Sequence, residues 1–228
     1  MLPMKRHALV TGASSGIGAS IALRLLVQGW RVTGVARRAT EQSDPDYRGI
    51  GCDLADAPSR DDLLARVGTV DAFVHAAGFL GTGHLGALEP GIHAAMWQVH
   101  VAAAEHLANR LLSSMNAGSR IVLIGSRTAT GSAGRSQYGA TKAALVAMAR
   151  SWAIELAPRG VTVNVVAPAA TDTPMLQDPA RSVVAPRLPP IGRYIKPAEV
   201  AGAVAFLLSP DADAITGQVL TICGGSSL

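Results

Sequence analysis

Short apolar runs alternate along the chain with longer segments in which apolar residues recur every three or four positions. The short runs predict buried parallel strands at residues 8–10, 31–35, 72–75, 120–124, 161–166 and 219–222. The longer segments predict helices at residues 17–28, 92–115, 142–156 and 197–208. Because strands and helices alternate, we predict an α/β fold with a doubly wound parallel sheet.

One stretch interrupts this alternation. Residues 173–197 contain six prolines, which are Pro174, Pro179, Pro186, Pro189, Pro190 and Pro197. Prolines at this density forbid a long helix or a central strand, and long loops in compact domains are usually functional. We therefore interpret residues 173–197 as a substrate loop or lid within a single domain that covers residues 1–228.

Composition and charge narrow the class of protein. Apolar residues make up 49% of the chain and aromatic residues only 4%, so Ala, Val, Leu and Ile must build the core. The net charge is +4, but the basic residues are scattered, which favours a small anionic ligand over nucleic acid. The first residues lead directly into a strand, and no apolar run is long enough to span a bilayer. With two distant cysteines, Cys52 and Cys223, these features predict a cytoplasmic protein.

The first predicted strand ends in a glycine-rich turn, Thr11-Gly-Ala-Ser-Ser-Gly-Ile-Gly18, that leads directly into a predicted helix. Gly12 permits the tight turn, Gly16 lets the backbone approach a pyrophosphate, and Gly18 permits close packing of the helix. The helix N-terminus offers unpaired N–H groups and the positive end of the helix dipole. Glycines at this spacing also occur in turns without a ligand, but their position after the first strand favours dinucleotide binding on a Rossmann fold.

The end of the second predicted strand indicates which dinucleotide is bound. Ala36-Arg37-Arg38 stands where an NAD-binding protein commonly has an acid that binds the ribose hydroxyls. Arg37 instead offers a planar cation suited to the 2′-phosphate of NADP, whereas for Arg38 a solvated basic turn is an equal alternative. Asp53, which follows another short apolar stretch, either accepts a hydrogen bond from the adenine amino group or caps the next helix.

Tyr138 and Lys142 are candidates for acid–base chemistry. They are four residues apart at the start of a predicted helix and therefore share one face of it. A tyrosine is a poor base near neutrality, but an adjacent ammonium group favours the phenolate. Ser126, at the end of a predicted strand, offers a hydroxyl for a substrate oxygen. Together the three residues predict a site that delivers a proton.

Over nearly its whole length the chain resembles the short-chain dehydrogenase/reductase family, whose motifs occur here in the family's order. The resemblance implies that Tyr138 protonates a carbonyl oxygen, that Ser126 polarises it, and that Lys142 lowers the tyrosine pKa and holds the nicotinamide ribose. It implies a homotetramer or homodimer, for which the alanine-rich segments 94–112 and 143–153 offer helix faces, unless those faces belong to the core. The cofactor-binding residues would be Gly12, Ser14, Ser15, Gly16, Ile17, Gly18, Arg37, Arg38, Asp53, Leu54, Ala76, Ala77, Gly78, Tyr138, Lys142, Pro168, Thr171 and Thr173.

Several positions depart from the family pattern. His75-Ala-Ala-Gly78 replaces the usual Asn-Asn-Ala-Gly, so a backbone-fixing asparagine is missing. His100 stands where the family has the asparagine of its proton relay; it could act in catalysis by passing protons, or be a buried neutral histidine. Ser126 lies twelve residues before Tyr138, one fewer than usual, and Ala169 replaces a glycine. The histidines lie on different elements without ligand spacing, so we expect no metal.

The leading functional hypothesis is an NADP-dependent oxidoreductase that interconverts a carbonyl and an alcohol. The alternatives are a nucleotide-sensing protein whose relay has degraded at His100, and an isomerase or dehydratase. Phe79, Leu80, Arg127 and residues 175–188 are expected to form the substrate pocket, which suits a small apolar ketone or a 3-oxoacyl thioester. Four arginines would attract an acidic carrier or a carboxylate, unless they are simply solvated: Arg127, Arg135, Arg181 and Arg187.

Overall fold

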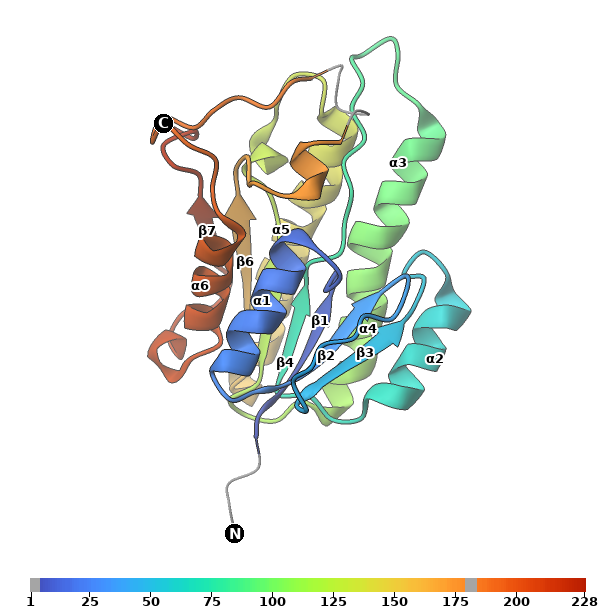
Figure 1. Cartoon of the computed structure of the whole chain (residues 1–228), viewed down its shortest axis with the longest axis vertical. Helices are drawn as coiled ribbons and strands as arrows, with labels where there is room; N and C mark the ends of the chain where they lie inside the picture. Colours follow the sequence, from blue (N-terminus) through green and yellow to red (C-terminus); the bar gives the residue numbers. More distant parts are fainter. Residues whose placement is uncertain (1–4, 179–183) are drawn as a thin grey trace.

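The computed structural model describes residues 5–178 and 184–228. Its centre is a seven-stranded sheet with the strand order β3-β2-β1-β4-β5-β6-β7, in which all neighbouring strands are parallel (Figure 1). The strands are β1 (His7–Thr11), β2 (Arg31–Ala36), β3 (Tyr47–Gly51), β4 (Ala72–His75), β5 (Arg120–Ile124), β6 (Thr162–Pro168) and β7 (Val219–Ile222). The α-helices are α1 (Gly16–Val27), α2 (Ala57–Val67), α3 (Pro90–Trp97), α4 (Ala103–Leu111), α5 (Ser136–Leu156) and α6 (Pro197–Leu207).

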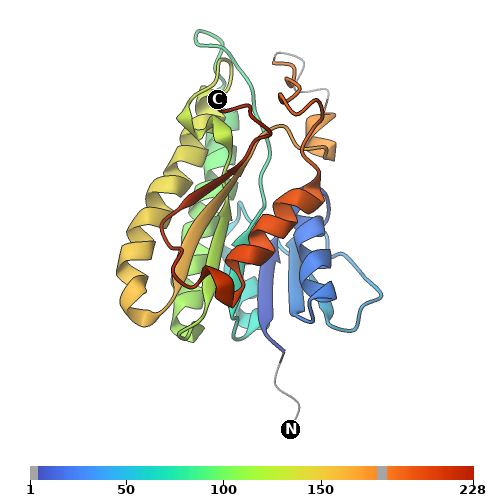
Figure 2. The same ribbon diagram turned by 90° about the vertical axis from the view of Figure 1, so that its left-hand side faces the viewer.

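Helices cover both faces of the sheet, which confirms the predicted doubly wound architecture. Helices α1 and α6 lie against each other on one face, and α2, α4 and α5 lie on the other (Figure 2). None of the helices in the described part of the chain is long and apolar enough to cross a membrane.

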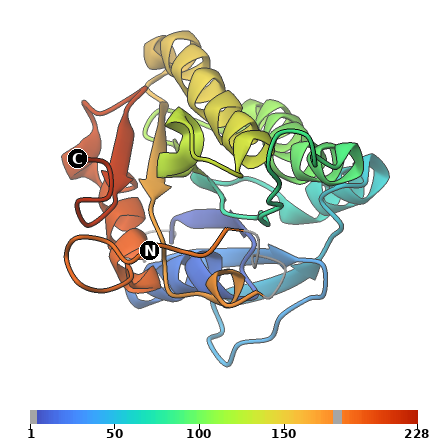
Figure 3. The ribbon, with the colours of Figure 1, turned by 90° about the horizontal axis from the view of Figure 1, so that it is seen from above.

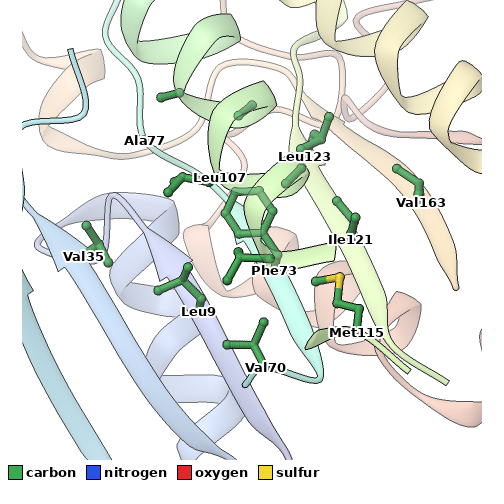
Figure 4. Close-up of a cluster of buried hydrophobic side chains, with 14 of the residues drawn as sticks. Leu9, Val35, Val70, Phe73, Ala77, Leu107, Met115, Ile121, Leu123 and Val163 are labelled. Carbon is green, nitrogen blue, oxygen red and sulfur yellow. The ribbon is translucent and has the colours of Figure 1, made fainter. Parts of the chain in front are cut away.

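The core consists of two apolar layers, one on each face of the sheet. Side chains that alternate along the central strands contribute to both layers. Leu9, Phe73 and Ile121 point to the α4 and α5 side, where Leu107 packs against them (Figure 4). The neighbouring residues Val10, Val74 and Val122 point to the α1 and α6 side. Because both faces of these strands are buried, they form continuous apolar runs in the sequence.

The strand order reverses between β1 and β4, and this reversal determines where a ligand can enter. The carboxyl ends of the two strands lie side by side, with Thr11 opposite His75. In open parallel sheets a crevice forms at such a reversal, between loops that leave in opposite directions. Figure 3 shows the molecule from above, the side toward which the strand arrows of Figure 1 point.

Several elements differ from the sequence-based expectation, among them α2, for which only a helix somewhere after Asp53 was expected. Strand β3 was not predicted, because two of its five residues are glycines and it lies at the sheet edge. The predicted helix 92–115 begins earlier, at Pro90, and a π-helical segment, Gln98–Ala102, separates α3 from α4. Helix α5 starts at Ser136, before the predicted segment 142–156, and it carries both Tyr138 and Lys142, as their spacing predicted.

The predicted loop at 173–197 contains little regular structure where it is described. A single 3₁₀ turn covers Pro174–Leu176, and an isolated parallel bridge pairs Thr171 with Ile195. Pro179 lies outside the described residues. The bridge brings the two ends of this loop together next to the carboxyl end of β6.

Candidate active site

Two adjoining cavities lie at the carboxyl ends of the strands. The turn cavity, of about 640 Å³, contains predicted cofactor residues, namely Gly12, Ser14, Ser15, Gly16, Ile17, Gly18, Arg37, Asp53, Leu54, Ala76, Ala77, Gly78 and Thr173. The tyrosine cavity, of about 510 Å³, contains Ser126, Tyr138, Lys142, Pro168 and Thr171. Ile17, Thr173 and Met175 line both. The cavities therefore form one continuous site, whereas Arg38 and His100 line neither.

The glycine turn can have no side chains at its tightest points. Gly12 has φ +70°, and a Cβ there would lie 2.8 Å from the backbone nitrogen of Ala77. A Cβ on Gly18 would overlap the Gly12 carbonyl oxygen. The turn leads into α1, which has no acidic residue in its first turn. An anionic group can thus approach the N–H groups of this helix without repulsion.

Thr11 and His75 tie the turn to the end of β4. The Thr11 hydroxyl oxygen accepts hydrogen bonds from the backbone N–H groups of Ala76 and Ala77, both at 3.1 Å. It donates its own proton to Nδ1 of His75, 3.0 Å away, and Nε2 of His75 donates to the Val99 carbonyl at 3.0 Å. Burial lowers the pKa of His75 to about 3, so the ring is neutral. His75 therefore takes over the role of the asparagine that the family usually has here, because it connects the backbone after β4 to Thr11 and to Val99.

The basic end of β2 and Asp53 both border the turn cavity. Arg37 is exposed and makes no hydrogen bond or ion pair with the described residues, so its guanidinium group is available to a ligand. The alternative role of Asp53 as the cap of the next helix is wrong, because the Asp56 carboxylate accepts from Ser59 N–H at 2.9 Å and caps α2. The Asp53 carboxylate accepts from the nearby Ala55 N–H at 2.9 Å.

Tyr138, Lys142 and Ser126 converge on the tyrosine cavity from two elements. The Lys142 Nζ atom is buried, lies 5.7 Å from the centre of the Tyr138 ring, and donates to the Ile124 carbonyl at 2.8 Å. Burial lowers the pKa of Lys142 to about 7. The Ser126 Oγ atom lies 2.8 Å from Thr128 Oγ1 and accepts from Thr128 N–H at 3.2 Å. The serine hydroxyl is therefore held in one orientation beside the cavity.

His100 is buried in the π-helical segment with both ring nitrogens occupied. Its Nδ1 lies 2.8 Å from Thr141 Oγ1, and its Nε2 accepts from the Phe79 N–H at 3.1 Å. Burial, with Lys142 nearby, holds the pKa of His100 well below its usual value. These contacts favour the interpretation of His100 as a buried neutral histidine over its interpretation as a residue that passes protons.

The predicted substrate pocket is partly rearranged. Leu80 and Arg127 line the tyrosine cavity, as do the loop residues Met175, Leu176, Val184, Pro186 and Leu188. Phe79 lines the turn cavity instead, with its ring 5.7 Å from that of His100, because its backbone N–H is held by His100. Arg135 and Arg187 also line the tyrosine cavity, while Arg181 lies outside the described residues.

Thr11 and Thr141 are among the contributors to the site that were not predicted. Each lies within a recognisable motif, but only the partners across the fold show what its hydroxyl group does. Across residues 5–178 and 184–228, no three His, Cys, Asp or Glu side chains lie where they could jointly hold a metal ion.

Comparison with known proteins identifies the family. The family model described as enoyl-(acyl carrier protein) reductase matches residues 12–227. A 3-oxoacyl-(acyl-carrier-protein) reductase from Vibrio cholerae is 36% identical over 234 residues, which cover 96% of each chain. The chain belongs to the short-chain dehydrogenase/reductase family.

Solved structures of other short-chain dehydrogenases/reductases share the fold. A short-chain dehydrogenase from Burkholderia cenocepacia, solved in complex with NADP, has a TM-score of 0.86 and 34% identity, with 98% of both chains covered. A 3-ketoacyl-(acyl-carrier-protein) reductase from Brucella melitensis, complexed with NADH, has a TM-score of 0.87 and 28% identity over 98% of both chains. The fold is therefore the Rossmann type of the short-chain dehydrogenases/reductases, and the protein is an oxidoreductase.

Proposed function

We propose that this protein is an NADP-dependent reductase that interconverts a carbonyl and a secondary alcohol. One observation carries the proposal: Ser126, Tyr138 and Lys142 line a cavity that is continuous, through Thr173, with the cavity around the glycine turn. A nucleotide that binds along the turn would extend into the cavity that contains the proton donor. Such a nucleotide supplies a hydride to the carbonyl carbon when it is bound.

In the proposed mechanism, Tyr138 donates its phenolic proton to the substrate oxygen while Ser126 donates a hydrogen bond to the same oxygen. The ammonium form of Lys142 beside the tyrosine ring favours the phenolate that remains. Lys142 would also hold the ribose of the nucleotide. Because Lys142 is buried, its interaction with the phenolate is little screened by water.

The remaining cofactor contacts follow from the turn cavity. The backbone at Gly12–Gly18 and the N-terminus of α1 would bind the pyrophosphate, Asp53 the adenine amino group, and Thr173 the carboxamide. Arg37 would bind the 2′-phosphate. Relatives have been solved with NADP and with NADH, and in this chain Arg37 at the end of β2 favours NADP.

We expect the protein to prefer NADPH over NADH by about tenfold or more, since a charge-assisted hydrogen bond contributes about 1.5–3 kcal/mol. The combined replacement Ala36→Asp and Arg37→Gln should shift the preference toward NADH. Fluorescence titration with both nucleotides measures the two dissociation constants. Arg110→Gln is the matched control, since Arg110 is also an exposed arginine but lies on α4 and lines neither cavity, and it should change neither dissociation constant. Equal affinities for NADPH and NADH in the unaltered protein would contradict the role of Arg37.

For the substrate we propose a 3-oxoacyl thioester, with a small apolar ketone as the second candidate. The tyrosine cavity combines apolar walls with guanidinium groups, because Leu80, Met175 and Leu176 line it together with Arg127, Arg135 and Arg187. An acyl chain suits the apolar part, and a phosphate-bearing thioester carrier suits the arginines. The name of the Vibrio cholerae relative indicates the same class. A higher kcat/KM for 3-oxoacyl thioesters than for ketones of equal chain length would support this order, and the reverse ranking would favour the ketone.

We further propose a homotetramer or homodimer. Large apolar side chains are exposed outside the cavities, among them Ile154 next to the end of α5, Phe206 on α6 and Leu220 on β7, and a second copy of the chain could cover them. Light scattering at micromolar concentration should therefore give a mass of two or four chains. A mass of one chain would contradict self-association. The cytoplasmic location stays a prediction.

A further inference from the structure

A chain of hydrogen bonds crosses the protein interior behind Tyr138. It runs from the backbone N–H of Phe79 to Nε2 of His100 (3.1 Å), from Nδ1 of His100 to Oγ1 of Thr141 (2.8 Å), and from Oγ1 of Thr141 to the carbonyl oxygen of Tyr138 (2.8 Å). His100 and Thr141 are both fully buried. Water therefore does not compete for these bonds, and each is stronger than it would be at the surface.

The protons in this chain can be arranged in only one way. A carbonyl oxygen only accepts, so the Thr141 hydroxyl must donate its one proton to Tyr138. Thr141 Oγ1 then has only its lone pairs left for His100, so Nδ1 of His100 must carry a proton. The Phe79 N–H also donates, so Nε2 of His100 must be unprotonated. His100 is thus a neutral imidazole locked in its Nδ1–H tautomer.

The buried histidine next to His100 is held in the opposite tautomer. Nε2 of His75 faces the Val99 carbonyl and must carry the proton, while its Nδ1 accepts from Thr11. The two rings therefore have distinct spectroscopic signatures within one protein.

This chain of hydrogen bonds connects the two walls of the active site. Phe79 follows Gly78 on the wall of the turn cavity, and Tyr138 belongs to the first turn of α5 on the wall of the tyrosine cavity. His100 fits closely between them: a Cβ on Gly78 would lie 2.9 Å from its Nε2, and its ring meets the Tyr138 ring edge-on with centres 5.7 Å apart. A shift of His100 would move the phenol relative to the wall that faces the nucleotide.

We propose that His100 and Thr141 are positioning residues that hold the Tyr138 phenol in register with the nucleotide-binding wall. Neither residue lines the turn cavity or the tyrosine cavity, so we assign neither of them a contact with substrate or nucleotide. This inference rests on the proposed function, in which Tyr138 is the proton donor. A displacement of a reacting group by about 1 Å can cost about 100-fold in rate, so a rigid connection of this kind affects turnover directly.

The first test removes the Thr141 hydroxyl group from the middle of this chain of hydrogen bonds. Thr141→Val keeps the side-chain shape but leaves Nδ1–H of His100 without an acceptor, and we expect kcat to fall about 10- to 100-fold with little change in nucleotide affinity. Thr141→Ser retains the hydroxyl and should recover most of the rate. Thr162→Val is the matched control, because Thr162 is also buried but its hydroxyl makes no hydrogen bond to any described residue. It should leave kcat unchanged.

The second test replaces the ring. His100→Gln provides a carbonyl oxygen for Phe79 N–H and an amide proton for Thr141, whereas His100→Leu provides neither. We expect the glutamine variant to keep a much larger share of kcat than the leucine variant. Equal losses in both variants, or a Thr141→Val variant as fast as the unaltered protein, would overturn the inference.

A third measurement does not depend on turnover. Nitrogen NMR of the histidine rings in the nucleotide-free protein should show a buried neutral ring protonated at Nδ1 that is lost in His100→Gln, and a ring protonated at Nε2, assigned to His75. His7 is also buried, and its Nδ1 faces the Thr69 carbonyl at 2.7 Å, so it should give a second Nδ1–H signal that persists in His100→Gln. If the unaltered protein turns over no carbonyl substrate, the proposed function fails. The NMR result still decides whether the chain of hydrogen bonds through His100 exists. A His100 ring protonated at Nε2 would overturn the inference even in an active enzyme.

Discussion

Tyr138→Phe is expected to lower kcat by about 10²- to 10⁴-fold, the usual contribution of a positioned general acid, and to leave nucleotide affinity nearly unchanged. The substitution removes only the phenolic hydroxyl. The ring keeps its edge-on contact with His100, whose centre lies 5.7 Å away, and the Tyr138 backbone carbonyl still accepts from Thr141. The loss should therefore be confined to proton transfer. Steady-state rates with a carbonyl substrate, together with nucleotide titration, measure the two effects separately.

Tyr194→Phe is the control for this variant. Tyr194 is half-buried and lines neither cavity, so its replacement should leave both kcat and nucleotide affinity unchanged. If Tyr138→Phe retained a substantial part of the activity, Tyr138 would not be the proton donor, and the proposed mechanism would fail.

Lys142→Ala is expected to damage both kcat and nucleotide affinity, because we assign Lys142 to the ribose as well as to the phenolate. The Lys142 Nζ atom lies beside the Tyr138 ring and donates to the Ile124 carbonyl, so removing it also leaves that buried oxygen without its partner. We expect kcat to fall about 100-fold or more, because the variant has no ammonium group to stabilise the charge that develops in the transition state.

Lys142→Met separates the loss of charge from the loss of packing. Methionine fills most of the space of the lysine stem, so a deficit that persists in Lys142→Met arises from the missing ammonium group. If kcat and nucleotide affinity recovered in Lys142→Met, Lys142 would act only by filling space. If neither variant had an effect, Lys142 would not belong to the site.

Much of the fold is predictable from the sequence because both faces of the central sheet are buried. Strands β1, β4, β5 and β6 are continuous apolar runs, which identify them without further context. Strand β3 is not such a run: Gly49 is needed because a Cβ there would overlap the backbone of Thr40, a contact that only the folded chain reveals. The interruption of helix 92–115 likewise depends on tertiary contacts, since His75 binds the Val99 carbonyl within the π-helical segment.

The candidate site was predictable where a local motif carries the chemistry. The glycine turn, Ser126, Tyr138 and Lys142 are recognised from spacing, and the structure brings them to two joined cavities. The roles of His75 and His100 were not predictable, because the partners that set their tautomers lie on other elements of the fold. The position of Phe79 was missed for the same reason.

The most direct test of the account is net consumption of NADPH with a carbonyl substrate, followed at the absorbance band of the reduced nicotinamide. We predict that the unaltered protein oxidises one NADPH for each hydroxyl group formed from a 3-oxoacyl thioester or an apolar ketone. Product analysis of the same reaction establishes the ratio. Tight nucleotide binding without net oxidation across a panel of both substrate classes would contradict the account and favour a nucleotide-sensing protein.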